Sequence, residues 1–192
     1  MSGARLKTEL RITGGTLRGR RVPVPRGDVR PTSERARQAY FNIIGDRIID
    51  ARFLDLFAGS GIFSFEAISR GAASALAVDS SRGNLAQIER LAETLGVNIK
   101  IAQIDIVRAE GRIRGTFDLA YADPPYDFAH YDDLLMLLDN AGFSENAIIG
   151  VEHRRHSSPF TVEPQRLAFW RRAEYGEVWI TFFTSGKAPG LQ

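Results

Sequence analysis

The stretch Asp55-Leu56-Phe57-Ala58-Gly59-Ser60-Gly61 decides the fold, because it leads from an apolar run into a helix-like segment through two glycines. Phe53–Ala58 is typical of a buried strand, and Ile62–Arg70 is typical of a helix. In an open α/β sheet, ligands bind at the carboxyl end of such a strand, where glycines let the backbone approach them closely. The stretch therefore predicts a strand, a ligand-binding turn and a helix.

Strand and helix patterns alternate along the rest of the chain. We expect further strands at Ala75–Asp79, Val97–Ala102, Phe117–Ala122 and Ala147–Glu152, and further helices at Arg82–Leu95 and Tyr131–Asn140. This alternation predicts an α/β fold with a parallel sheet that helices cover on both faces. Near the end, Leu167–Arg171 and Glu177–Thr184, separated by Tyr175-Gly176, predict a closing antiparallel hairpin.

The first 44 residues have a different character. Leu10–Gly14 and Arg21–Val24 predict a small hairpin, and Pro31-Thr32-Ser33-Glu34 predicts the start of a helix over Arg35–Ile44. We therefore divide the chain into an N-terminal extension (1–44), a main domain (45–185) and a flexible tail (186–192).

The composition excludes several classes of site. The chain has 192 residues, 44% of them hydrophobic, which is typical of a single-core domain. It has no cysteine, and this excludes disulfides, thiolate zinc sites, iron–sulfur clusters and a cysteine nucleophile. No apolar run approaches the length of a membrane span, and the N-terminus lacks the apolar core of a signal peptide. We expect a cytoplasmic protein.

The net charge of +2 conceals an uneven distribution. Residues 1–40 carry ten basic and three acidic side chains, a net charge of +7, whereas the other residues carry 15 basic and 20 acidic ones, a net charge of −5. A basic segment beside an acidic body indicates that the first part meets a polyanion such as a nucleic acid. A merely solvated, arginine-rich surface is the alternative reading.

The sequence excludes two common classes of ligand for the glycine turn. A phosphate-binding P-loop needs a lysine after the second glycine, and none follows Gly61. A dinucleotide fingerprint needs a third glycine, or an alanine, at position 64, where this chain has Ser64. Asp55 suits a cationic ligand, and S-adenosylmethionine carries both an ammonium and a sulfonium. Asp79 ends the next strand, where a ribose-binding carboxylate belongs. A purely structural tight turn remains the alternative.

Asp105 follows the third strand of the main domain and is placed to close the adenine end of this site. A loop aspartate after a strand also commonly caps a helix.

A second motif, Asp123-Pro124-Pro125-Tyr126, follows the strand at Phe117–Ala122. Two prolines stop the strand ladder and fix the backbone, so that Asp123 and the Pro124 carbonyl are presented as acceptors for an amino group. The Tyr126 ring offers a stacking face for a base. Acceptors on the protons of an exocyclic amine favour its methylation, because they redirect the lone pair and take up developing positive charge. A packed proline-rich turn is the structural alternative.

Weaker signals occur near the C-terminus. Glu152-His153 and His156 form an incomplete metal set, so we expect no metal and instead a strand-end turn that contacts RNA or solvent. The arginine pairs 154–155 and 171–172 either extend a phosphate-binding rim or are solvated. We expect the aromatic residues of this region to lie in the core rather than to form a base-stacking platform: Phe169, Trp170, Trp179, Phe182 and Phe183.

These motifs together resemble those of S-adenosylmethionine-dependent amino-methyltransferases. The N-terminal motifs Arg11-Ile12-Thr13-Gly14-Gly15, Arg18-Gly19-Arg20, Arg30-Pro31-Thr32 and Arg37 to Phe41-Asn42 narrow the resemblance to the RsmD family of bacterial 16S rRNA guanine-N2 methyltransferases, over roughly residues 10–183. The resemblance implies a Rossmann-like seven-stranded sheet and methylation of one guanine, with an assembled or assembling small ribosomal subunit as the acceptor. It implies no metal, and we expect a monomer.

The resemblance also implies roles for individual residues. Asp55, Gly59 and Gly61 would hold the methionine part of the cofactor, Asp79 its ribose and Asp105 its adenine region. The neighbouring Phe57, Ser80 and Ile106 would complete that site, and Asp123–Tyr126 would form the guanine site. The residues expected to bind RNA are Arg11, Arg18, Arg20, Arg30, Thr32 and Arg37.

Two positions depart from the family pattern. Ser64 stands where relatives commonly have glycine, and Glu93-Thr94-Leu95-Gly96 lacks the asparagine that relatives often have in the second helix just before such a segment.

Two other functions stay open at this point. One is an adenine-N6 DNA methyltransferase, which the small size and the absence of a target-recognition domain disfavour. The other is a non-catalytic RNA-binding assembly factor, which the intact motifs disfavour.

Overall fold

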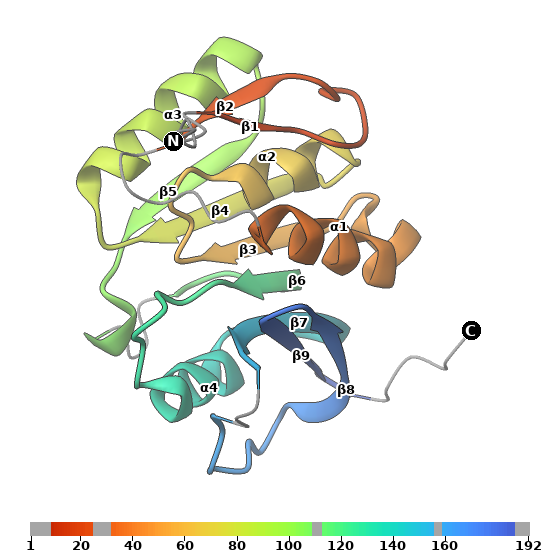
Figure 1. Cartoon of the computed structure of the whole chain (residues 1–192), viewed down its shortest axis with the longest axis vertical. Coiled ribbons are helices and arrows are strands. Elements are labelled where there is room, and N and C mark those ends of the chain that lie inside the picture. Colours follow the sequence, from red (N-terminus) through yellow and green to blue (C-terminus); the bar gives the residue numbers. More distant parts are fainter. Residues whose placement is uncertain (1–8, 25–31, 109–112, 156–158, 187–192) are drawn as a thin grey trace, which may run out of the picture.

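A computed structural model of the chain describes residues 9–24, 32–108, 113–155 and 159–186. The elements follow one another as β1 (Glu9–Arg11), β2 (Arg21–Pro23), α1 (Thr32–Ile44), the short 3-10 helix η1 (Gly45–Ile48), β3 (Arg52–Leu56), α2 (Ile62–Ser69), β4 (Ser74–Asp79), α3 (Arg82–Leu95), β5 (Ile99–Gln103), η2 (Ile106–Arg108), β6 (Phe117–Ala122), α4 (Tyr131–Asn140), β7 (Phe143–Arg154), β8 (Ala168–Tyr175) and β9 (Val178–Thr184). Figure 1 shows their arrangement.

The main sheet has seven strands in the order β5-β4-β3-β6-β7-β9-β8. Neighbours from β5 to β7 are parallel, whereas β9 pairs antiparallel with both β7 and β8. This confirms the expected α/β fold with a mostly parallel sheet and a C-terminal antiparallel hairpin. The last parallel strand is longer than predicted, because β7 begins at Phe143 rather than Ala147. The hairpin turn falls at Gly176-Glu177, one residue later than predicted.

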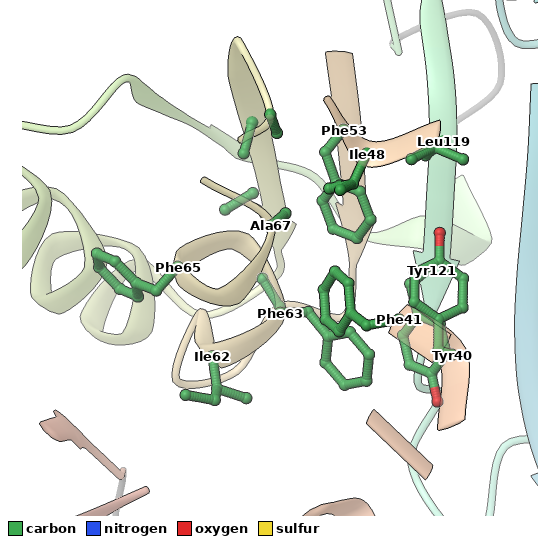
Figure 2. Packing of buried hydrophobic residues seen from close by; sticks show 14 of the residues in the cluster. Tyr40, Phe41, Ile48, Phe53, Ile62, Phe63, Phe65, Ala67, Leu119 and Tyr121 are labelled. Carbon is green, nitrogen blue, oxygen red and sulfur yellow. The ribbon is translucent and has the colours of Figure 1, made fainter. Parts of the chain in front are cut away.

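Helices cover both faces of the sheet, each over its own apolar cluster. Residues of α1, α2, α3 and the β1–β2 hairpin pack against one face, and residues of α4 and η2 pack against the other. Figure 2 shows the first cluster, in which Tyr40 and Phe41 of α1 lie beside Phe63 of α2 and Tyr121 of β6. The Phe63 and Tyr121 rings are stacked, with centroids 3.8 Å apart.

Hydrogen bonds at the Gly14-Gly15 turn join the β1–β2 hairpin to α2. The backbone N–H of Thr16 donates to the Ser69 carbonyl at 2.7 Å, and the Ser69 hydroxyl donates to the Gly14 carbonyl at 2.5 Å. This approach requires a glycine at position 15, because a Cβ there would lie 1.6 Å from the Ser69 carbonyl oxygen and φ is +74°. The hairpin and α1 contribute Leu10, Val22 and Tyr40 to the same cluster as the sheet. The N-terminal extension therefore shares its core with the main domain.

Candidate active site

The carboxyl ends of β3 and β6 meet at the point where the strand order reverses. β3 lies between β4 and β6, all three parallel, so the turns after β3 and β6 open at the same edge of the sheet. A cavity of about 330 Å³ lies there. Its lining comes from the hairpin, the glycine turn, the end of β4 and the turn after β6: Leu10, Val24, Asp55, Phe57, Ala58, Gly59, Ser60, Ile62, Phe63, Asp79, Ser80, Ser81, Asn84, Asp123, Pro124 and Pro125.

The glycine turn is held in an unusual backbone conformation. Phe57, Gly59 and Gly61 all have positive φ, at 59°, 53° and 76°. A positive φ at a bulky non-glycine residue such as Phe57 costs energy and persists only where the surroundings enforce it. Two hydrogen bonds do so, because Ala58 N–H donates to the Val78 carbonyl and Gly59 N–H donates to the Asp79 carboxylate at 2.8 Å. The turn is thus tied to the end of the neighbouring strand.

Asp55 lies on the floor of the cavity and is almost fully buried, at 2% exposure. Its Oδ2 accepts hydrogen bonds from the backbone N–H of Ser64 at 3.0 Å and from the Ser64 hydroxyl at 2.7 Å. Burial raises the pKa of Asp55 to about 7, although the Ser64 hydrogen bonds oppose the shift, and the charges of Asp79 and Asp123 add to it. The departure at Ser64 thus has a structural role, since its hydroxyl stabilises the buried carboxylate.

Asp79 connects the glycine turn to the start of α3. Its Oδ2 accepts from Gly59, while its Oδ1 accepts from Ser81 N–H at 2.7 Å and from the Asn84 amide at 3.4 Å. Ser81 in turn caps α3, because its hydroxyl accepts from Asn84 N–H. A carboxylate has about four acceptor positions, so these three bonds orient Asp79 and leave about one position for a hydroxyl donor in the cavity.

The turn after β6 forms the opposite wall. Asp123 N–H donates to the Leu56 carbonyl at 3.3 Å, which ties the end of β6 to the end of β3. Asp123, Pro124 and Pro125 line the cavity, as the sequence predicts. Tyr126 lies outside the lining, is 57% exposed, and has the Arg154 guanidinium carbon 3.1 Å from its ring centroid. Its ring thus stacks with a cation in this structure, and base stacking by Tyr126 stays a prediction.

Three predicted cofactor residues lie outside the lining. Gly61 caps α2 against α3, where a Cβ would lie 2.8 Å from Ile88 Cγ1, so its role is packing. Ile106 is buried in the apolar cluster under α4. Asp105 is exposed and accepts from Val107 N–H at 3.2 Å, which is the helix-capping geometry of the alternative interpretation. Contact of these three with a cofactor stays a prediction.

Several lining residues were not predicted. Leu10 and Val24 come from the hairpin, which the charge pattern assigns to RNA alone, and nothing in the sequence places them at this edge. Ser60 lies within the glycine turn, Ile62 and Phe63 follow it directly, and Ser81 and Asn84 carry the spacing of a helix cap after Asp79. Those five were accessible from sequence spacing around the predicted residues.

Of the residues predicted to bind RNA, Arg11, Arg18 and Arg20 are exposed on the hairpin, Thr32 begins α1, and Arg30 lies outside the described residues. The prediction for Arg37 is wrong, because its side chain is fully buried. Its Nη2 donates to the Arg11 carbonyl at 3.0 Å, and its Nε lies 3.5 Å from Glu66 Oε2. Glu66 also accepts from Thr13 N–H, so Arg37 joins α1, α2 and the hairpin instead of meeting a phosphate.

The expected strand-end turn at Glu152-His153 is also corrected. Both side chains are buried, at 5% and 4% exposure, and the Tyr121 hydroxyl donates to Glu152 at 2.5 Å. His153 contacts the Thr181 hydroxyl and the Arg154 carbonyl. His156 lies outside the described residues. In the described part of the chain, no three acidic, histidine or cysteine side chains gather as a metal site would require, and no helix is long and apolar enough to span a membrane.

Comparison with known proteins gives consistent matches. The family described as "Conserved hypothetical protein 95" matches residues 10–184. The protein named ribosomal RNA small subunit methyltransferase D from Escherichia coli (strain K12) is 33% identical, over 88% of this chain and 87% of its own length. Its namesake from Haemophilus influenzae is 31% identical, over 82% of this chain and 85% of its own length.

Solved structures share the fold. The Escherichia coli protein yhhF has a TM-score of 0.81 at 28% identity, covering 93% of this chain and 98% of its own. The Thermus thermophilus 16S rRNA N2 G1207 methyltransferase, solved with AdoMet and guanosine, has a TM-score of 0.71 at 17% identity, covering 93% of this chain and 50% of its own. The chain belongs to the Conserved hypothetical protein 95 family, together with the ribosomal RNA small subunit methyltransferase D proteins.

Proposed function

We propose that this chain transfers a methyl group from S-adenosylmethionine to the exocyclic N2 of a guanine in the 16S rRNA of the small ribosomal subunit. The observation that carries the proposal is the shared cavity, whose walls are the glycine turn with Asp79 on one side and Asp123-Pro124-Pro125 on the other. The names of the relatives support an rRNA acceptor in the small subunit. We further propose that the enzyme is a cytoplasmic monomer.

The residues of the cavity fit the cofactor. Asp79 would accept a ribose hydroxyl at its remaining acceptor position, since its oxygens already face the turn that lines the cavity. Asp55 would face the positively charged methionine end, and ionisation of its carboxyl below its raised pKa of about 7 would be favoured by that charge. The bound cofactor supplies an electrophilic methyl group on a sulfonium.

The turn after β6 would position the base that accepts the methyl group. Asp123 and the Pro124 carbonyl would accept the two amine protons of the base, which directs the nitrogen lone pair toward the methyl group. Transfer of the methyl group to the nitrogen would leave the cofactor as its neutral sulfide, and Asp123, which accepts one of the amine protons, would take up the proton that the methylated amine loses. Most of the rate gain would come from holding nitrogen and carbon in line at roughly 3–3.5 Å. The target guanine would be turned out of its stack to reach the cavity.

The test is incubation with labelled S-adenosylmethionine and, separately, naked 16S rRNA, assembled small subunits and DNA, followed by nucleoside analysis. We expect labelled N2-methylguanosine from small subunits. Labelled N6-methyl-2′-deoxyadenosine from DNA would replace the proposal by a DNA methyltransferase, and absence of transfer to every acceptor would favour an assembly factor.

The variant Asp123→Ala tests the role of the turn after β6 in catalysis. We expect loss of methyl transfer by at least about a hundredfold, because removal of one stabilising acceptor typically costs that much. Cofactor affinity, measured by calorimetry, should stay within about twofold, since Asp123 faces the base rather than the ribose. Retained turnover would refute the role of Asp123.

A further inference from the structure

A second and larger hollow lies away from the cavity, between α1 and the edge strand β8. Its volume is about 960 Å³, and it is lined from the α1 side by Arg35 and Arg47 and from the β8 side by Trp170, Arg171 and Tyr175. Asp46 is the one acidic side chain among its described lining residues. We call this hollow the α1–β8 groove.

The lining of the groove combines positive charge with flat aromatic faces. Arg35 and Arg47 are exposed, and Arg171, Trp170 and Tyr175 are half-buried, so all five side chains reach the surface. Grooves that bind single-stranded nucleic acid have this composition, because cationic side chains follow the phosphates while aromatic rings stack with bases of any sequence. The Trp170 ring already stands 5.8 Å from the Arg171 guanidinium, an arrangement that a nucleobase can extend.

A bulge in β8 brings the two kinds of side chain together. Phe169 pairs with Phe183 and Arg171 pairs with Phe182, so Trp170 is the extra residue. In a regular strand, adjacent residues 170 and 171 would point to opposite faces of the sheet. The bulge lets both line the groove. Phe169 is 62% exposed, so the expectation that it lies in the core is wrong. Trp170 and Trp179 are half-buried, with Trp170 packed against the core cluster, and Phe182 and Phe183 are buried as predicted.

The groove leads toward the active-site edge of the sheet. α1 ends just before η1 and the start of β3, so its C-terminal end lies at the amino edge of the sheet and its N-terminal end lies toward the carboxyl edge, as Figure 1 shows. At the carboxyl edge, Tyr175 pairs with Val178 and Val178 pairs with Arg154. The Arg154 guanidinium stacks with Tyr126 of the catalytic turn. Two strand spacings, about 10 Å, therefore separate Tyr175, at the end of the groove, from Arg154, whose side chain reaches that turn.

We propose that the α1–β8 groove binds a single-stranded stretch of the same RNA that presents the target guanine. This inference rests on the proposed function and adds a second RNA surface. It lies on the other side of α1 from the β1–β2 hairpin, which carries Arg11, Arg18 and Arg20, as Figure 1 shows for these elements. With both surfaces engaged, the RNA would cross the carboxyl edge of the sheet, where the cavity opens. A purely structural account is that arginines and a bulge on an edge strand prevent pairing with other sheets.

The double variant Arg35→Gln/Arg171→Gln removes two charges from the groove without touching the cavity. We expect a KM for the RNA acceptor at least about tenfold higher, an unchanged kcat at saturating RNA, and an unchanged cofactor affinity. The slope of log affinity against log salt should fall by roughly 1.4, because each single-strand phosphate contact contributes roughly 0.7. The matched control is Arg90→Gln on α3, an exposed arginine outside the groove, which should change none of these quantities.

A second measurement uses the aromatic wall and does not depend on methyl transfer. The chain has two tryptophans, so Trp179→Phe leaves Trp170 as the single fluorescent reporter. A naked 16S rRNA transcript should quench its emission more strongly than an RNA duplex of equal length. Quenching should be lost in Arg35→Gln/Arg171→Gln and kept in Arg90→Gln, both made in the Trp179→Phe background.

The outcomes separate the two proposals. Quenching and an altered salt slope without methyl transfer would refute the proposed function and keep the groove as an RNA site. Normal methyl transfer with the same KM and salt slope in both variants would refute the groove and keep the function. An effect on assembled small subunits but not on naked rRNA would identify a ribosomal protein as the occupant, and would also overturn the inference.

Discussion

The buried carboxyl of Asp55 predicts an unusual dependence of stability on pH. In an unfolded chain an aspartate has a pKa near 3.8, whereas burial raises the pKa of Asp55 to about 7 in the folded protein. Between these values the folded state holds a proton that the unfolded state has released. The contribution of Asp55 to stability is therefore fully present below pH 4 and is lost as pH rises toward and through 7.

The magnitude follows from the size of the shift. The difference between a pKa of 3.8 in the unfolded chain and about 7 in the folded protein corresponds to about 4 kcal/mol of stability, of which about 2.5 kcal/mol would be lost between pH 5 and pH 8. The figure is an upper limit, because opening of the cavity to water weakens the effect of burial. The variant Asp55→Asn removes the titration, yet its amide oxygen can still accept the two hydrogen bonds from Ser64.

The assay is urea unfolding of both proteins at half-unit steps from pH 5 to pH 8. The difference in free energy of unfolding between Asp55→Asn and the parent chain isolates this carboxyl, because all other titrating groups are shared. We expect the difference to grow by about 2.5 kcal/mol in favour of the variant as pH rises. A constant difference across this range would refute the raised pKa.

Cofactor binding supplies an independent check on the same residue. A cationic ligand favours the ionised carboxylate, so cofactor affinity should increase with pH below 7 and level off above it. In Asp55→Asn, affinity should be lower and nearly independent of pH. Ser64→Ala is the matched control, because loss of its hydroxyl removes a contact that lowers the pKa and should move the midpoint of the parent curve to higher pH.

Two further predictions concern the attachment of the N-terminal segment. Arg37→Met should lower the free energy of unfolding in urea by about 3 kcal/mol, because it removes a positive charge beside the buried Glu66. The exposed control Arg18→Met should lower it by under about 0.5 kcal/mol. Equal losses would contradict the buried ion pair. Gly15→Ala should cost about 2 kcal/mol or more and expose the hairpin to protease, because its Cβ would meet the Ser69 carbonyl. Gly19→Ala, also at positive φ but with nothing within 4 Å of its Cβ, should cost only about 1 kcal/mol, and an equal loss in both would show that the backbone conformation, not the contact with Ser69, is what matters.

Local sequence patterns predicted the main elements with little error, for a physical reason. α3, α4 and β6 begin and end at the predicted residues, because apolar periodicity and turn residues are properties of neighbouring positions. β7 was predicted too short, because its first four residues lie beyond a shift in register with β6 that only strand pairing determines. The residues on the glycine turn, at the end of β4 and in the Asp123-Pro124-Pro125 turn were predicted for the cavity, because parallel strands bring their carboxyl ends to one edge.

What the sequence alone determined is therefore the fold class, the strand-end motifs and the family whose pattern they match. The tertiary structure decided which polar side chains face solvent, which a charge count cannot show. Arg37 and Arg18 are equal contributors to the basic segment, yet one is buried against Glu66 and the other is exposed. Leu10 and Val24 line the cavity, and Trp170 and Arg171 share a groove, only because distant segments pack together. Burial and proximity arise from contacts between residues far apart in the chain, so no local pattern encodes them.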